Sequence, residues 1–138
     1  MFKINCKVTK LPKFEDDRGF LIEFLKNREL DMEHEKFGQI YLATIKKGRI
    51  RGNHYHLNKR EVFTVMSGKA RVILEDIETK ERREVMLDPS EDKVMRVEFG
   101  PGVAHAIESI GEQDLVVVAY NDVQYDENKT DDIRYVLI

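Results

Sequence analysis

Tryptophan is absent from this 138-residue chain, cysteine occurs once, and there are three prolines and four histidines. The single cysteine, Cys6, excludes an intrachain disulfide, which fits a reducing compartment. No segment approaches the apolar length of a transmembrane helix, and residues 1–10 lack the apolar run of a signal peptide. We therefore expect a cytoplasmic protein that makes no use of the membrane.

A strong charge imbalance is also missing. The 23 basic and 26 acidic residues leave a net charge of −3, and no basic stripe stands out, which argues against nucleic acid as a partner. With 41% hydrophobic and 36% charged residues, the composition is that of a soluble globular protein. The length matches one domain with one core, so we predict a single domain over residues 1–138.

Short apolar or alternating runs recur along the chain between turn signals. We predict strands over residues 40–45, 62–66, 70–74, 82–87, 94–99, 105–110 and 115–120. The turn at 78–81 joins two of them, and 111–114 is predicted to be a hairpin loop. Only residues 27–36 look helical, and they could equally be a loop. Strands at such short intervals predict an all-β protein, a jelly-roll β-barrel.

The segment Leu115–Tyr120 is fully apolar and predicts a strand that is buried on both faces. One face would line the barrel and the other would meet a second subunit. We therefore expect a homodimer in which residues 3–24 lie against the partner's sheet, because long barrel strands leave edges that need cover.

Residues 48–68 carry the most informative pattern, Gly48-x5-His54-x-His56-x4-Glu61-x6-Gly68, and a lone His105 follows. Side chains alternate along a strand, so both paired histidines point the same way, and the carboxylate opens the next strand nearby. Imidazoles with a carboxylate suit zinc, iron, manganese, nickel or copper. The alternative is that the histidines are polar lining and the carboxylate is solvated at a turn.

This spacing resembles the cupin superfamily, whose first motif, G-x5-H-x-H-x3,4-E-x6-G, is complete here. The second, G-x5-P-x-G-x2-H-x3-N, is partly matched: Gly102 and His105 are present, Pro101 comes one place late, and Ser109 replaces Asn. The resemblance implies a divalent ion, zinc above all, with manganese, iron or nickel also possible. Its implied ligands are His54, His56, Glu61 and His105.

Residues 47–70 look more specifically like the cupin domain of bacterial polysaccharide biosynthesis enzymes. In capsule synthesis that domain is fused to a reductase, binds zinc and epimerises a nucleotide-linked 4-keto sugar. Residues 17–20 and 125–132 are similar to segments of the dTDP-4-keto-rhamnose 3,5-epimerases and dTDP-sugar 3,4-ketoisomerases. The metal-free rhamnose epimerases have Lys in the place of Glu61 and Gln in the place of His56, so the carboxylate here favours the zinc-binding branch. This chain carries no reductase domain.

Epimerisation next to a carbonyl requires removal and return of a proton, which a metal ion can assist by polarising the carbonyl and an imidazole can perform as base. His54 could be ligand or base, and we favour the ligand. Tyr120 and Tyr41 are candidate proton donors, although core packing is the commoner role of such tyrosines. Tyr55 points to the opposite face and is expected to be packing.

Three basic residues are candidates for binding the substrate. Arg51 and Arg18 could each hold a diphosphate, because planar guanidinium groups bind such anions bidentately. The alternative for both is a salt bridge in the protein. Lys59 is predicted on the turn at the pocket mouth, where it could also be simply solvated, and His34, among acids, is expected at the surface.

Two function classes are favoured, and a third is less so. The first is a nucleotide-sugar epimerase or isomerase of polysaccharide or deoxysugar biosynthesis. The second is a non-catalytic metal- or sugar-binding cupin. The third is a metal-dependent oxygenase or small-molecule isomerase, since other cupins use the same ligands; Arg51 and Arg18 favour the first over this third class.

Overall fold

The structure, a computed structural model, describes residues 4–30 and 37–138, and the predicted all-β class is confirmed. Its elements are β1 (Cys6–Leu11), β2 (Phe14–Asp16), β3 (Gly19–Leu21), the 3₁₀ turn η1 (Asn27–Glu29), β4 (Gln39–Ile45), β5 (Ile50–His56), β6 (Glu61–Ser67), β7 (Ala70–Asp76), β8 (Arg82–Leu87), β9 (Val94–Phe99), β10 (Val103–Ser109), β11 (Leu115–Asn121) and β12 (Asp132–Arg134).

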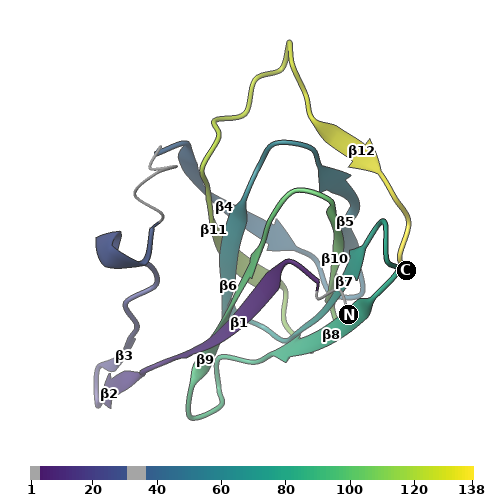
Figure 1. The fold of residues 1–138 in the computed structure, drawn as a ribbon. Coiled ribbons are helices and arrows are strands. Elements are labelled where there is room, and N and C mark those ends of the chain that lie inside the picture. Colours follow the sequence, from purple (N-terminus) through teal and green to yellow (C-terminus); the bar gives the residue numbers. More distant parts are fainter. Residues whose placement is uncertain (1–3, 31–36) are drawn as a thin grey trace.

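Ten of these strands form two five-stranded antiparallel sheets that face each other as a jelly-roll barrel (Figure 1). One sheet has the order β1-β9-β6-β11-β4, and the other has the order β12-β5-β10-β7-β8. The short strands β2 and β3 form a separate hairpin that projects from the barrel. The predicted jelly roll is therefore confirmed.

The core lies between the two sheets because alternate residues of each strand point inward. In β11, Leu115, Val117 and Ala119 are buried in it, whereas Val116 and Val118 on the other face are half-buried. The prediction that both faces of this strand are fully buried was therefore only half right. Apolar burial on one face is enough to specify the strand and its register.

One local prediction was wrong. Residues 111–114 do not close a hairpin, because β10 and β11 belong to different sheets and the chain crosses the barrel between them. For residues 27–36, either a helix or a loop or short turn was expected, and the described part forms the short 3₁₀ turn η1. Residues 31–36, and with them His34, lie outside the described residues. Sequence patterns show that strands are neighbours in the chain but not which sheet each one joins.

The start of the chain is bound to its own barrel. β1 pairs antiparallel with β9, from Cys6 opposite Phe99 to Leu11 opposite Val94. Residues 6–11 therefore form an edge strand in a sheet of their own chain. The β2–β3 hairpin is different, because its apolar side chains are exposed, Phe14 by 58% and Leu21 by 59%.

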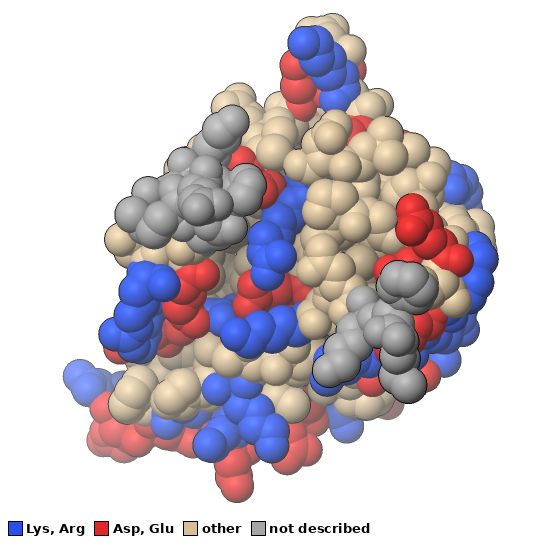
Figure 2. Space-filling view, in the orientation of Figure 1, with Lys and Arg blue, Asp and Glu red and all other residues tan. Residues whose placement is uncertain are grey.

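Charges of both signs are mixed over the face shown in Figure 2, with no continuous basic stripe of the kind that nucleic acids bind. Among the described residues, no helix is long and apolar enough to cross a membrane.

Candidate active site

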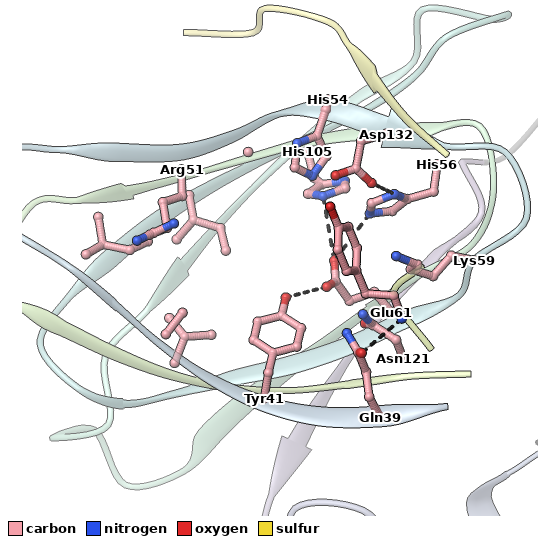
Figure 3. A pocket seen from close by; sticks show the side chains of 16 residues that line it. Gln39, Tyr41, Arg51, His54, His56, Lys59, Glu61, His105, Asn121 and Asp132 are labelled. Atoms are coloured by element: carbon pink, nitrogen blue, oxygen red, sulfur yellow. Dashed lines mark hydrogen bonds and ion pairs between the residues drawn. The ribbon is translucent and has the colours of Figure 1, made fainter. Parts of the chain in front are cut away.

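A cavity of about 480 Å³ lies inside the barrel, and side chains from both sheets line it (Figure 3). From the sheet that contains β4, β6 and β11 come, among others, Gln39, Tyr41, Glu61 and Asn121. From β5, β10 and β12 come Arg51, His54, His56, His105 and Asp132. All four sequence-predicted metal ligands, together with Arg51 and Lys59, therefore line one pocket.

A β-bulge in β5 allows Arg51 and the paired histidines to share this pocket. Regular alternation would place Arg51 on the face opposite His54. In the β5–β10 ladder, His105 lies opposite His54 but Ala106 lies opposite Gly52, so Asn53 is the extra, unpaired residue. Gly52 has φ +97°, and a Cβ there would come within 2.6 Å of the His105 carbonyl oxygen. Glycine is required at this position.

The three imidazoles converge. The ring centroids of His54, His56 and His105 lie 4.6 to 5.2 Å from one another, and each ring offers a nitrogen within 4.8 Å of the others. His105 also packs on the Phe99 ring at 4.1 Å. Its Nδ1 lies 3.2 Å from the Val103 carbonyl oxygen, which leaves Nε2 for the pocket.

Glu61 is buried, with 6% of its surface exposed, so the alternative of a solvated carboxylate at a turn is excluded. Its Oε1 accepts a 2.5 Å hydrogen bond from the Tyr41 hydroxyl, and the Asn121 carboxamide, with its nitrogen toward Glu61, donates at 3.0 Å. Oε2 lies 3.6 Å from Nε2 of His105 and 3.9 Å from Nε2 of His56. One oxygen is therefore held by the protein, and the other faces the imidazoles.

Burial shapes the protonation of these groups. It lowers the pKa of His54, His56 and, most strongly, His105, so all three are neutral imidazoles, the form that binds metal ions. Burial also raises the pKa of Glu61, and burial next to Glu61 raises that of Tyr41, which therefore keeps its proton.

The donor set fits a divalent ion. Tetrahedral zinc with bonds of about 2.0–2.2 Å needs ligand atoms about 3.4 Å apart. The Glu61 carboxylate comes close to this separation with two imidazoles, at 3.6 Å from His105 and 3.9 Å from His56, and the three imidazoles offer nitrogens within 4.8 Å of one another. Neutral imidazoles with one carboxylate suit zinc, and also manganese, iron or nickel. His54, His56, His105 and Glu61 are thus the residues that could hold the ion.

Lys59 lies in the connection between β5 and β6, as predicted, but it is buried rather than solvated, with 5% of its surface exposed. Its ammonium is directed into the pocket beside His56 and Glu61 (Figure 3), and its Nζ lies 3.7 Å from an Asp131 carboxylate oxygen. Arg51 is exposed at the other side of the cavity, where its Nε donates to the Thr44 carbonyl at 3.1 Å. The pocket therefore presents two cations to a ligand.

Other candidates are not brought to the pocket. Tyr120 lies on the opposite face of β11, where its ring is 6.2 Å from that of Phe37. Tyr55, as predicted, faces away and packs against Tyr135. Arg18 lies on the exposed β2–β3 hairpin and pairs with Asp16 at 2.6 Å, outside the residues that line the cavity. Of the two tyrosines proposed as proton donors, Tyr41 is the one in the pocket.

Sequence reasoning did not assign a role to Asp131 and Asp132. The strand β12 pairs with β5 and places Asp132 opposite His56. The Asp132 carboxylate lies 2.9 Å from Nδ1 of His56, and that of Asp131 lies 3.5 Å from it. The adjacent acids in the closing segment were the available signal, because a carboxylate commonly orients a ligating imidazole through its second nitrogen.

The sequence also matches known proteins. Residues 14–133 match the family model described as the polysaccharide biosynthesis C-terminal domain. The spore coat polysaccharide biosynthesis protein SpsL of Bacillus subtilis is 33% identical over 134 residues, covering 94% of this chain and 87% of SpsL. A UDP-2-acetamido-2,6-beta-L-arabino-hexul-4-ose reductase of Pseudomonas aeruginosa is 31% identical, and the match covers 88% of this chain but only 30% of the reductase.

Among solved structures, the capsular polysaccharide assembling protein CapF of Staphylococcus aureus is 30% identical with a TM-score of 0.69, and the match covers 92% of this chain and 34% of CapF. A dTDP sugar isomerase of Desulfovibrio desulfuricans G20 has a TM-score of 0.82 at 18% identity, covering 95% of this chain and 83% of the isomerase, so it shares the fold. The family match spans nearly the whole chain and includes the pocket-forming strands. This chain belongs to the polysaccharide biosynthesis C-terminal domain family and has the fold of the dTDP sugar isomerase.

Proposed function

We propose that this protein is a metal-binding cupin that epimerises or isomerises a nucleotide-linked 4-keto sugar in bacterial polysaccharide biosynthesis. The observation that carries the proposal is the convergence of three neutral imidazoles and Glu61 in one cavity that Arg51 and Lys59 flank. Relatives named for polysaccharide synthesis support the pathway class. Exchange of a sugar C–H proton with deuterated water tests this proposal.

The proposed metal ligands are His54, His56, His105 and Glu61. A divalent ion held there would supply Lewis-acid polarisation of a carbonyl oxygen. The alternative for His54 is the role of general base, because it is half-buried whereas His56 and His105 are buried. The two roles exclude each other at one nitrogen, so activity of the metal-free protein would assign His54 as base.

Two further side chains would act on the sugar itself. The Lys59 ammonium would donate hydrogen bonds to the oxygen that gains negative charge when the neighbouring C–H proton leaves. Tyr41 keeps its proton because burial and Glu61 raise its pKa, so it would act as a neutral hydrogen-bonding group rather than as a base. Both lie inside the barrel, where exclusion of water strengthens electrostatic contacts.

Arg51 is the proposed contact for the diphosphate. A guanidinium has five N–H donors, and the Thr44 carbonyl uses one of them, which fixes the group at the pocket. Arg51→Ala is expected to raise KM by about 10- to 100-fold with little change in kcat, because a hydrogen bond to a charged group contributes about 1.5–3 kcal/mol. Steady-state kinetics measure this. The exposed neighbour Arg49, replaced by Ala, is the control; equal effects of both variants would contradict the assignment.

We also propose that the protein is a homodimer. On the outer face of β4, Ile40 is 59% exposed and Leu42 is 69% exposed, and β4 is an edge strand of its sheet. An apolar strand edge of this kind is usually covered by another chain. The exposed apolar side chains of the β2–β3 hairpin, Phe14 and Leu21, would add to the covered area.

Analytical ultracentrifugation at micromolar concentration is expected to give the mass of two chains. Leu42→Glu should shift the protein toward the mass of one chain, because a charge would be buried in the interface. A single-chain mass for the unchanged protein would contradict the dimer.

A further inference from the structure

The bulge in β5 carries a residue whose role neither the metal ligands nor the substrate contacts explain. Asn53 has φ +58°, a left-handed conformation that asparagine and glycine tolerate better than other residues. It follows Gly52, which is also left-handed, and it has no residue opposite it in β10. The backbone geometry alone would be satisfied by glycine, so the carboxamide has to be explained separately.

That carboxamide binds the segment that follows β12. The Asn53 Oδ1 accepts hydrogen bonds from the backbone N–H groups of Leu137 at 2.8 Å and Ile138 at 3.3 Å, and Nδ2 donates to the Ile138 carbonyl at 3.3 Å. The Asn53 backbone carbonyl accepts from Tyr135 N–H at 2.7 Å. Beyond Arg134, where β12 ends, the Asn53 side chain thus replaces the partner strand in bonding the backbone of residues 137 and 138.

The strand that this contact extends is weak by itself. β12 has three residues, lies at the edge of its sheet and pairs with β5 alone. Three residues is the short end of the usual strand length, so few backbone hydrogen bonds hold this strand. Yet β12 places Asp132 opposite His56, with its carboxylate oxygen 2.9 Å from the imidazole Nδ1. Whatever fixes the segment after β12 therefore also fixes the partner of a pocket imidazole.

We propose that Asn53 is a positioning residue for the His56–Asp132 pair. By tying residues 135–138 to β5, its carboxamide keeps the Asp132 carboxylate 2.9 Å from Nδ1 of His56, a buried nitrogen that has no other hydrogen-bond partner among the described residues. A carboxylate at this distance favours the ring proton on Nδ1 and leaves Nε2 toward the pocket. The functional importance of this orientation rests on the proposed metal site, since an oriented imidazole with a free Nε2 is the form that binds a metal ion.

Nitrogen-15 NMR of the metal-free protein tests the proposal, because it reports which ring nitrogen of His56 carries the proton. The unchanged protein should show the proton on Nδ1. Asn53→Gly keeps the left-handed backbone at no steric cost and removes only the carboxamide. It should move the proton distribution of His56 toward Nε2, as Asp132→Ala does, and the double variant should match Asp132→Ala alone.

Tyr135→Phe is the control. It removes the hydroxyl that donates to Glu75 and accepts from Lys80, contacts that hold the same segment to the neighbouring strands. We expect it to shift the His56 spectrum less than Asn53→Gly does, because residues 135–138 stay hydrogen-bonded to Asn53. An unchanged spectrum in Asn53→Gly, or an equal shift in Tyr135→Phe, would overturn the proposal.

Zinc affinity gives a second readout. Asn53→Gly should weaken zinc binding by roughly 10-fold, the low end of the range for residues that orient a metal ligand. In a protein that already carries Asp132→Ala, it should cause no additional loss of zinc affinity. Additive losses in the double variant would show that Asn53 acts independently of Asp132. If the unchanged protein bound no zinc or exchanged no proton, the proposed function would fail, while the metal-free NMR comparison would still decide the role of Asn53.

Discussion

Replacing Glu61 by Gln is expected to lower the affinity for zinc by more than about 100-fold while the barrel stays folded. Gln has the same shape and can still accept the Tyr41 hydrogen bond. The atom that faces His56 and His105 would become an amide group, which replaces an anionic ligand of the ion. Mutation of a residue that only hydrogen-bonds to a metal ligand already lowers metal affinity by about 10- to 100-fold. Loss of a ligand itself should lower the affinity by more than that.

Isothermal titration with zinc and elemental analysis of untagged protein measure this effect. Glu108→Gln is the matched control, because Glu108 lies on the same strand as His105 but pairs with Arg71 on the outside of the barrel. We expect that variant to bind zinc normally. Normal zinc binding by Glu61→Gln, or no binding by the unchanged protein, would remove the carboxylate from the site and favour the metal-free chemistry in which His54 is the base.

The second large effect is expected at Lys59. Lys59→Met should lower kcat for proton exchange by about 10²- to 10³-fold, the usual cost of removing one donor from a developing oxyanion. Zinc affinity should stay equal or rise, because the lost positive charge lies beside the metal ligands. The effect should therefore separate chemistry from metal binding.

Single-turnover exchange together with zinc titration distinguishes this role from a structural one. Lys46→Met, at an exposed lysine outside the pocket, is the control. If Lys59→Met loses zinc and activity together, the lysine supports the fold of the site. A kcat within about threefold of the unchanged protein would rule out Lys59 as the oxyanion donor.

The spacing of the motif predicted the residues at the centre of the pocket because these residues are close together in the chain. His54 and His56 are two residues apart on one strand, and Glu61 begins the strand after a short turn, so the sequence fixes their relative positions. His105 could be added only through the resemblance to cupins, since its place depends on the pairing of β10 with β5.

The remaining site residues depend on long-range pairing that the sequence does not show. Leu115 and Val117 of β11 point into the barrel, so alternation along the strand places Asn121 in the pocket and Tyr120 outside it. Side chains alternate faces along a strand, but this alternation does not say which face points into the barrel. A shift of one residue in the register exchanges the two faces. Likewise, the bulge at Asn53 and the pairing of β12 arise from sheet contacts.

Exchange with deuterated water tests most directly whether this pocket removes a proton beside a sugar carbonyl. Zinc-loaded protein is mixed with nucleotide-linked 4-keto-6-deoxy sugars, and proton NMR follows the C3 and C5 signals. We predict loss of one of these signals with the unchanged protein, and at least about 100-fold slower loss with Lys59→Met. Measurable binding of such a sugar without exchange at C3 or C5 would contradict the account and favour a non-catalytic sugar-binding cupin.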